Sequence, residues 1–162
     1  MPDTVSLERY DMLRAKLADY LLLQVNTFIA GAGERAIAPA MELLTEKSAD
    51  MKVQEARRNG QEKGLRAADS LSKNLEVSMG ETFNSDYRVE SNNSTRTVIL
   101  DRCGCIESVL KTAETYDMSK PQAKSIFCGA CMSGYRKASS TLSLEFKGRL
   151  SEKGCTMSFS TI

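Results

Sequence analysis

The residues best suited to chemistry in this chain are its five cysteines, which all lie in the last third of the sequence. They form Cys103-x-Cys105, Cys128-x-x-Cys131 and a single Cys155, and the chain contains no histidine. Four thiolates from two closely spaced pairs are the ligand set of a tetrahedral zinc site or an iron–sulfur cluster. We therefore predict a metal site at these cysteines, with zinc favoured over a cluster. Cys155 is either a fifth ligand or a replacement for one of the four.

Two other roles for the cysteines stay open at this stage. Free cysteine is often a buried core residue, and a thiol can also act as a nucleophile if a positive neighbour lowers its pKa. Arg102, beside Cys103, is such a neighbour, and Cys128 with Cys131 has redox-pair spacing. The strand–helix–strand pattern that accompanies thioredoxin-like pairs is missing.

A glycine motif, Gly31-Ala-Gly33-Glu-Arg-Ala36, fits the loose pattern of dinucleotide-binding loops. The residues before it have helical periodicity, and no second strand ending in Asp or Glu follows at the required distance. We interpret the two glycines as the end of a helix.

The elements that must position the cysteines begin with helices. Apolar residues recur every three or four positions over residues 4–30, on a face so wide that the helix is either buried on several sides or paired with a second subunit. Further helices are expected over 34–47 and 49–75. Gly60 and Gly64 in the last one predict a kink or a close helix crossing. Residues 1–48 form an N-terminal helical segment suited to dimerisation, and residues 49–162 form the cysteine-containing core.

The pattern then changes to strands and short helices. A hairpin is expected over 87–101 with its turn at 91–94, followed by a helix over 106–116. Ser119 predicts the start of the helix that carries Cys128 and Cys131. Alternating apolar residues predict strands from 142 and over 155–162. The fold class is therefore α+β, with N-terminal helices packed on a small antiparallel sheet with crossover helices.

Composition narrows the range of functions. The 162 residues suffice for one domain, 1–162, with a real hydrophobic core. The net charge of +1 argues against a nucleic-acid partner. The most apolar run, Leu17 to Ala32, is interrupted by Asp19, Gln24 and Asn26 and is too short to span a membrane. Without a signal-peptide pattern at the N-terminus we expect a cytoplasmic protein, where clustered cysteines usually indicate metal binding or thiol chemistry.

The order of cysteines and elements supports a family comparison. A strand leads into the first cysteine, a helix and a second cysteine group follow, and two strands end the chain. The segments are Val98–Cys103, Ile106–Ala113, Phe127-Cys-Gly-Ala-Cys131, Leu142–Leu150 and Gly154–Phe159. Residues from about 50 to 162 thereby resemble the superfamily of L-2-amino-thiazoline-4-carboxylic acid hydrolase-like proteins and 4-vinyl reductase (hydrocarbon-binding) domains. In that superfamily the first cysteine is usually followed by an aromatic residue or proline, which Gly104-Cys105 replaces here.

The resemblance implies a cytosolic ligand-binding or sensor-type domain. It would bind a small organic molecule in an apolar pocket between sheet and helices, beside a cysteine-bound zinc. In the vinyl-reductase relatives zinc is held by cysteine and glutamate near the last strands, which implicates Cys131, Cys155 and Glu145 and competes with the four-cysteine set. A metal-assisted hydrolase of a thiazoline-type ring is the first alternative. The second is an interaction subunit, such as a homodimer, that acts through its N-terminal helix.

Overall fold

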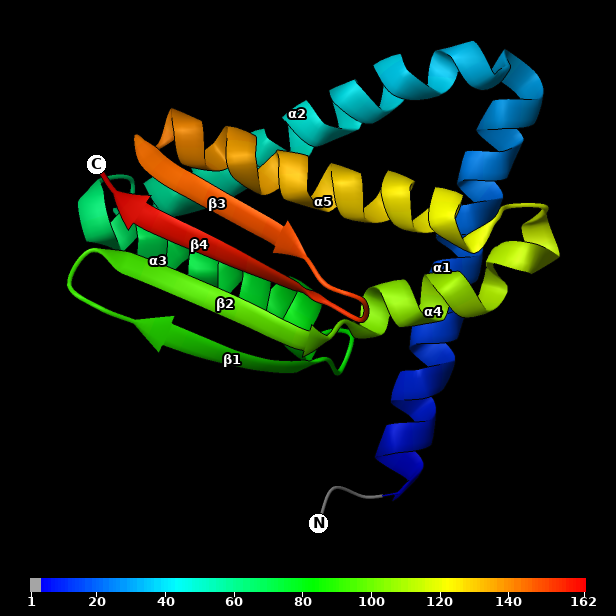
Figure 1. Ribbon diagram of the computed structural model, residues 1–162, viewed down its shortest axis with the longest axis horizontal. Helices are drawn as coiled ribbons and strands as arrows, with labels where there is room; N and C mark the ends of the chain where they lie inside the picture. Colours follow the sequence, from blue (N-terminus) through cyan, green and yellow to red (C-terminus); the bar gives the residue numbers. More distant parts are fainter. Residues whose placement is uncertain (1–3) are drawn as a thin grey trace.

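The chain begins with long helices and ends in an antiparallel sheet (Figure 1). The structure is a computed structural model that describes residues 4–162, with side chains from residue 7. The elements are, in chain order, α1 (Thr4–Ala32), the 3-10 helix η1 (Glu34–Ala36), α2 (Ile37–Arg58), α3 (Gly64–Leu75), the π-helix η2 (Glu76–Glu81), β1 (Asp86–Ser91), β2 (Thr95–Arg102), α4 (Gly104–Thr112), the 3-10 helix η3 (Ala113–Tyr116), α5 (Lys120–Thr141), β3 (Leu144–Leu150) and β4 (Cys155–Thr161). The predicted α+β fold is confirmed.

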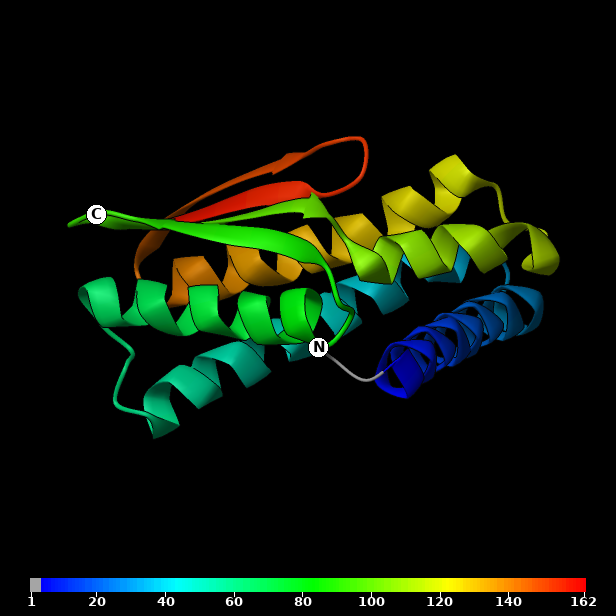
Figure 2. The ribbon, with the colours of Figure 1, turned by 90° about the horizontal axis from the view of Figure 1, so that it is seen from below.

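The sheet has the strand order β1-β2-β4-β3, with each neighbouring pair antiparallel. The chain leaves the sheet after β2, passes through α4 and α5, and returns as β3 at the far edge. Helices α3 and α5 cover the same face of the sheet, as Figure 2 shows. The opposite face carries paired hydroxyl groups: Thr97 Oγ1 lies 2.8 Å from Ser158 Oγ, and Thr95 Oγ1 lies 2.9 Å from Ser160 Oγ. These polar pairs suit a face that stays in contact with water.

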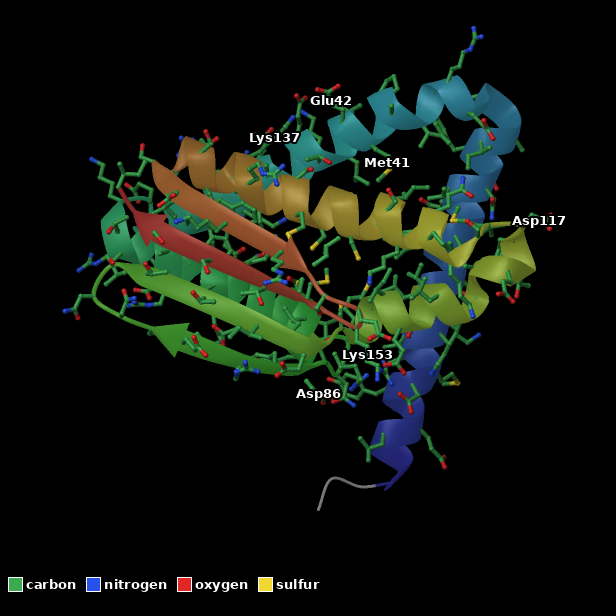
Figure 3. All side chains as sticks on the ribbon, viewed as in Figure 1. Met41, Glu42, Asp86, Asp117, Lys137 and Lys153 are labelled. Carbon is green, nitrogen blue, oxygen red and sulfur yellow. The ribbon has the colours of Figure 1, made fainter. Side chains whose placement is uncertain are left out.

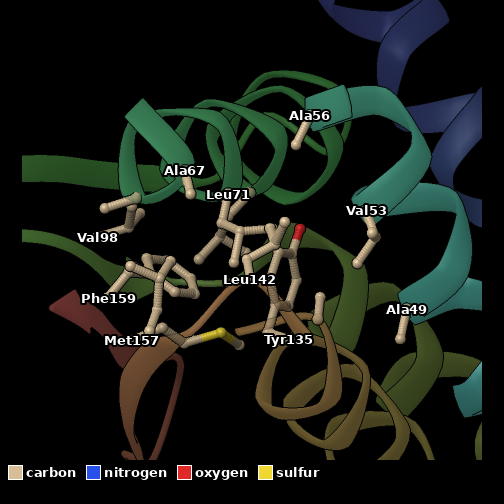
Figure 4. Packing of buried hydrophobic residues seen from close by; sticks show 14 of the residues in the cluster. Ala49, Val53, Ala56, Ala67, Leu71, Val98, Tyr135, Leu142, Met157 and Phe159 are labelled. Carbon is tan, nitrogen blue, oxygen red and sulfur yellow. The ribbon is translucent and has the colours of Figure 1, made fainter. Parts of the chain in front are cut away.

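The main hydrophobic core lies between this sheet and the helices (Figure 4). Phe159 of β4 is fully buried, and its ring centroid lies 5.8 Å from those of both Tyr135 and Phe146. A second group of buried side chains joins α1 to α4 and to the start of α5. It consists of Ala18, Leu22, Ile106, Val109, Ala113, Met118 and Ala123. The two cores meet at Cys103, which packs against both.

The predicted division of the helices is wrong between residues 34 and 75. Helix α2 runs without a break through residue 48 to Arg58, and the chain turns over residues 59–63 before α3 begins. Gly60 and Gly64 have φ angles of 63° and 55°, in the left-handed region that favours glycine. A Cβ at either position would have no neighbour within 4 Å, so of the two predicted alternatives, a kink or a close helix crossing, the crossing is wrong. The two glycines shape a turn instead.

Helix α1 is less buried than its wide apolar face suggests. Among its described side chains only Ala18 and Leu22 are fully buried, so burial on several sides is wrong within this chain. Large apolar side chains of α1 remain exposed, namely Leu7, Tyr10, Met12, Leu13, Leu17, Tyr20, Leu23 and Phe28. The predicted helix end is confirmed, because α1 stops at Ala32.

The predictions for the second half are confirmed with small shifts. Strands β1 and β2 form the expected hairpin. Ser119 caps α5 by accepting a hydrogen bond from the Gln122 N–H at 3.3 Å. Leu142 ends α5 rather than opening the next strand, because its N–H bonds back to the carbonyls of Ala138 and Ser139.

Candidate functional site

All five cysteines line one cavity of about 560 Å³. Helices α1 to α5 contribute to its wall, and β2, β4 and the end of β3 supply further lining residues. In Figure 3 sulfur atoms, drawn in yellow, gather between α5 and the end of the β3–β4 hairpin. All five thiols are free and partly exposed. Cys105 lines the same cavity as the other four. We call this space the thiol cavity.

The secondary structure explains why cysteines so far apart in sequence meet. Cys103 is the N-cap of α4, and its N–H donates to the Lys153 carbonyl at 2.8 Å, which ties the end of β2 to the β3–β4 turn. Cys105 follows in the first turn of α4. Cys128 and Cys131 are three residues apart on α5 and therefore share a face. Cys155 opens β4 opposite Leu100 of β2.

Two glycines allow the backbones around the thiol cavity to approach closely. A Cβ on Gly104 would lie 1.9 Å from the Phe83 carbonyl oxygen, and one on Gly154 would lie 1.9 Å from the Leu100 carbonyl oxygen. The Gly104 N–H also donates to Ser85 Oγ at 2.9 Å. Glycine at position 104 therefore has a steric reason. It lets α4 start directly against the segment that follows η2.

A lysine links α5 to the hairpin that carries Cys155. Lys124 Nζ donates to the carbonyl oxygens of Ser151 and Glu152, at 2.8 and 2.7 Å. Lys124 lies one turn before Cys128, so this clamp fixes the cysteine-bearing face of α5 against the turn between β3 and β4.

Burial makes several of these thiols harder to ionise than an ordinary thiol. It raises the pKa of Cys128 to about 11 and those of Cys131 and Cys155 to about 12, with neighbouring cysteines adding to the shift. The pKa of Cys105 rises for the same reasons. A nucleophilic thiol needs the opposite shift. The guanidinium of Arg102, the predicted activating neighbour, binds Asp86 at 2.9 Å and Glu107 at 2.7 Å.

The geometry of the predicted metal ligands is looser than a bound ion requires. Among residues 4–162, no three side chains of His, Cys, Asp or Glu are arranged to hold a metal ion. The thiols share a cavity but do not converge on one point. Glu145, implicated by the family comparison, is exposed on β3, lies 3.2 Å from Lys147 and does not line the thiol cavity. The structure therefore groups Cys131 with Cys155 but separates both from Glu145.

The thiol cavity also contains functional groups that the sequence did not single out. Lys52 of α2 lines the cavity, donates to Ser48 Oγ at 2.7 Å, and lies 4.6 Å from the ring centroid of Tyr135. Burial lowers the pKa of Lys52, and nearby Cys131 and Glu55 act in the opposite direction. Tyr135 donates to Asn74 Oδ1 at 2.7 Å. In sequence Lys52 is one of many charged residues on α2, so no signal there distinguishes it.

A smaller hollow of about 360 Å³ lies between α2 and α5. Met41, Glu42 and Lys137, labelled in Figure 3, stand at its rim. It contains no cysteine, so the thiol cavity is the candidate site.

Comparisons with models of known protein families, with curated proteins and with solved structures gave no match. The resemblance drawn from the sequence therefore stays a prediction. Within residues 4–162 no helix combines the length and apolar character needed to cross a membrane.

Proposed function

We propose that this protein is a ligand-binding or sensor-type domain that holds a small, largely apolar organic molecule in the thiol cavity. The observation that carries the proposal is the cavity itself. Its volume, about 560 Å³, falls within the roughly 300–1,000 Å³ of small-molecule sites. Most of its wall consists of apolar side chains and thiols, with a few polar groups from α2, α3 and α5. Such a wall favours an apolar body with one or two polar atoms.

The polar groups of the thiol cavity favour binding over catalysis. General acid–base chemistry needs a titratable group with a suitable pKa that is free to reach the substrate. Among the described residues lining the thiol cavity, Glu55 supplies the one carboxylate, and it accepts a hydrogen bond from Asn74 Nδ2 at 2.8 Å. The thiols that burial keeps protonated are weak nucleophiles. The hydrolase alternative would have to use Lys52, whose pKa burial lowers, as its base, since Glu55 is already bound by Asn74.

A shift in thermal unfolding tests the binding proposal. The reduced full chain is heated with neutral bicyclic aromatic compounds, and a compound at ten times its Kd should stabilise the fold by about 1.4 kcal/mol. Bound compound should also slow maleimide labelling of the thiols. A panel that neither stabilises the protein nor protects its thiols would contradict the proposal. Ring opening of a thiazoline substrate by the same sample would favour the hydrolase.

A second role, metal binding, is favoured by the meeting of five thiols at one cavity. We propose that three or four of them bind a thiophilic ion, zinc first, once their side chains turn toward a common point. Ligands must lose their protons, so uptake by these high-pKa thiols should release protons and strengthen as pH rises. Metal analysis and anaerobic UV–visible spectra of the purified protein test this. A colourless protein with stoichiometric metal indicates zinc, a brown one indicates an iron–sulfur cluster, and a metal-free protein that takes up no zinc refutes the idea.

The exposed side of α1 supports a third proposal, a homodimer, which we place in the cytoplasm only because the sequence predicts that compartment. Tyr10, Leu13, Leu17 and Tyr20 recur every three or four residues and form one exposed apolar stripe beside the buried face of α1. A two-fold axis would place the same stripe on both copies and bury it in a single contact. Light scattering should give a dimer for the natural chain and a monomer for Leu13→Glu. A chain that is monomeric throughout the micromolar range contradicts this arrangement.

A further inference from the structure

The charge that matters most in the thiol cavity is that of Lys52. Its ammonium group is half-buried and has neutral partners: Ser48 Oγ at 2.7 Å, the Ser48 carbonyl at 3.3 Å and the Tyr135 ring at 4.6 Å. Within the described residues it forms no ion pair with a carboxylate. Buried charges in proteins are usually paired. Lys52 is half-buried rather than fully buried, and it has no directly bound anion among the described residues, so its charge can still take a partner.

The surrounding charges point to an anion as that partner. The charged residues of the cavity wall all come from α2, and they are Lys47, Lys52, Glu55 and Arg58. Three cations thus face a single carboxylate, and that carboxylate already binds Asn74. The rest of the wall is mostly apolar side chains and thiols, with uncharged polar groups such as Asn74, Ser78 and Tyr135. A ligand that fills this space meets excess positive charge on the α2 side and largely apolar surface on the others.

We infer that the thiol cavity binds an amphipathic anion, an apolar molecule whose single carboxylate accepts hydrogen bonds from Lys52 Nζ. This inference rests on the proposed function and defines its ligand class. The carboxylate would supply the missing counter-charge, and the apolar body would pack against side chains such as Leu75, Phe83 and Met132. A charge-assisted hydrogen bond in a partly desolvated site is stronger than a neutral one, so the acid should be preferred over its neutral isostere.

Two matched probes test the inference: 1-naphthylacetate and its neutral isostere 1-naphthylacetamide. Calorimetry with the full chain should show the acid binding about tenfold more tightly than the amide, equivalent to about 1.4 kcal/mol. Lys52→Met should remove this preference by weakening the acid about tenfold while leaving the amide within about twofold. Lys52→Arg should retain most of the preference because the charge remains.

The control variant is Lys111→Met, which removes the same charge from an exposed position on α4 outside the cavity. It should leave both affinities unchanged. The inference is overturned if the natural chain binds acid and amide equally, or if Lys52→Met weakens both to the same extent. In either case the amide still binds, and the proposed function stands. If neither probe binds the natural chain, both proposals fail together.

Discussion

The clearest structural test of the site is the substitution Gly104→Ala, between the first two cysteines. The added Cβ would lie 1.9 Å from the Phe83 carbonyl oxygen, where real Cβ atoms essentially never come closer than 3.0 Å. The obstacle is backbone, which cannot rotate away, so α4 or the Phe83 segment must move by about 1 Å. Overpacking of this kind costs about 1–3 kcal/mol. The better helix propensity of alanine recovers less than about 1 kcal/mol, since Gly104 is the first helical residue.

A net loss of about 2 kcal/mol should lower Tm by about 4–8 °C in a chain of this length. The matched control is Gly129→Ala, on α5 between the other two paired cysteines. Gly129 is exposed and helical, and an added Cβ there would have no neighbour within 4 Å. Gly129→Ala should therefore raise the free energy of unfolding by up to about 1 kcal/mol and Tm by about 2–4 °C. Differential scanning calorimetry of the reduced proteins measures both. The reasoning fails if Gly104→Ala is as stable as Gly129→Ala.

Three further results are expected. Since burial raises the pKa of Cys128, Cys131 and Cys155 above the usual 9.0, the folded state keeps protons that the unfolded chain loses, so stability should fall between pH 8 and 10. Urea unfolding of the metal-free protein should show about 1 kcal/mol lost per thiol, allowing for solvent screening; an equal fall in the triple alanine variant would contradict this. Tyr135→Phe should cost about 1–2 kcal/mol in the same assay, since it removes a 2.7 Å hydrogen bond to Asn74; unchanged stability would refute the role of that bond. Leu22→Ala should lower the free energy of unfolding by about 2–5 kcal/mol, because it leaves a cavity beside α4. The control Leu23→Ala, at an exposed position, should change it little. Equal effects of the two variants would argue against the packing of α1.

Local signals in the sequence were sufficient for most of the fold. The change from helical spacing to alternation located the β1–β2 hairpin, and the Ser119 cap with Pro121 located α5. These features depend on residues that lie close together in the sequence. The predicted boundary between two helices at residue 48 was wrong because local spacing does not show that α2 continues to Arg58. Gly60 and Gly64 fit a kink or a crossing equally well until their left-handed φ angles are known.

The site was only partly predictable because it depends on long-range packing. The five cysteines that the sequence pointed to line one cavity, while their role as metal ligands stays a prediction. The cysteine spacing did not give the burial that raises the pKa of most of these thiols, nor the separation of Glu145 from them. Lys52 was missed because its importance arises from Tyr135, eighty-three positions later, and from the fact that, among the described residues, its ammonium forms no ion pair with a carboxylate. Neither feature can be recognised from the type of residue at position 52.

The central claim, that the thiol cavity is a binding site, is tested most directly by titrating the protein with a neutral apolar fluorophore, N-phenyl-1-naphthylamine. The natural chain should bind it with micromolar affinity, and Cys131→Phe should weaken binding at least about tenfold, because the added ring occupies part of the cavity. Gln122→Phe, at an exposed position on α5 outside the cavity, should bind like the natural chain. Circular dichroism should confirm that both variants are folded. Absence of binding to the natural chain, or binding that Cys131→Phe leaves unchanged, would contradict the account.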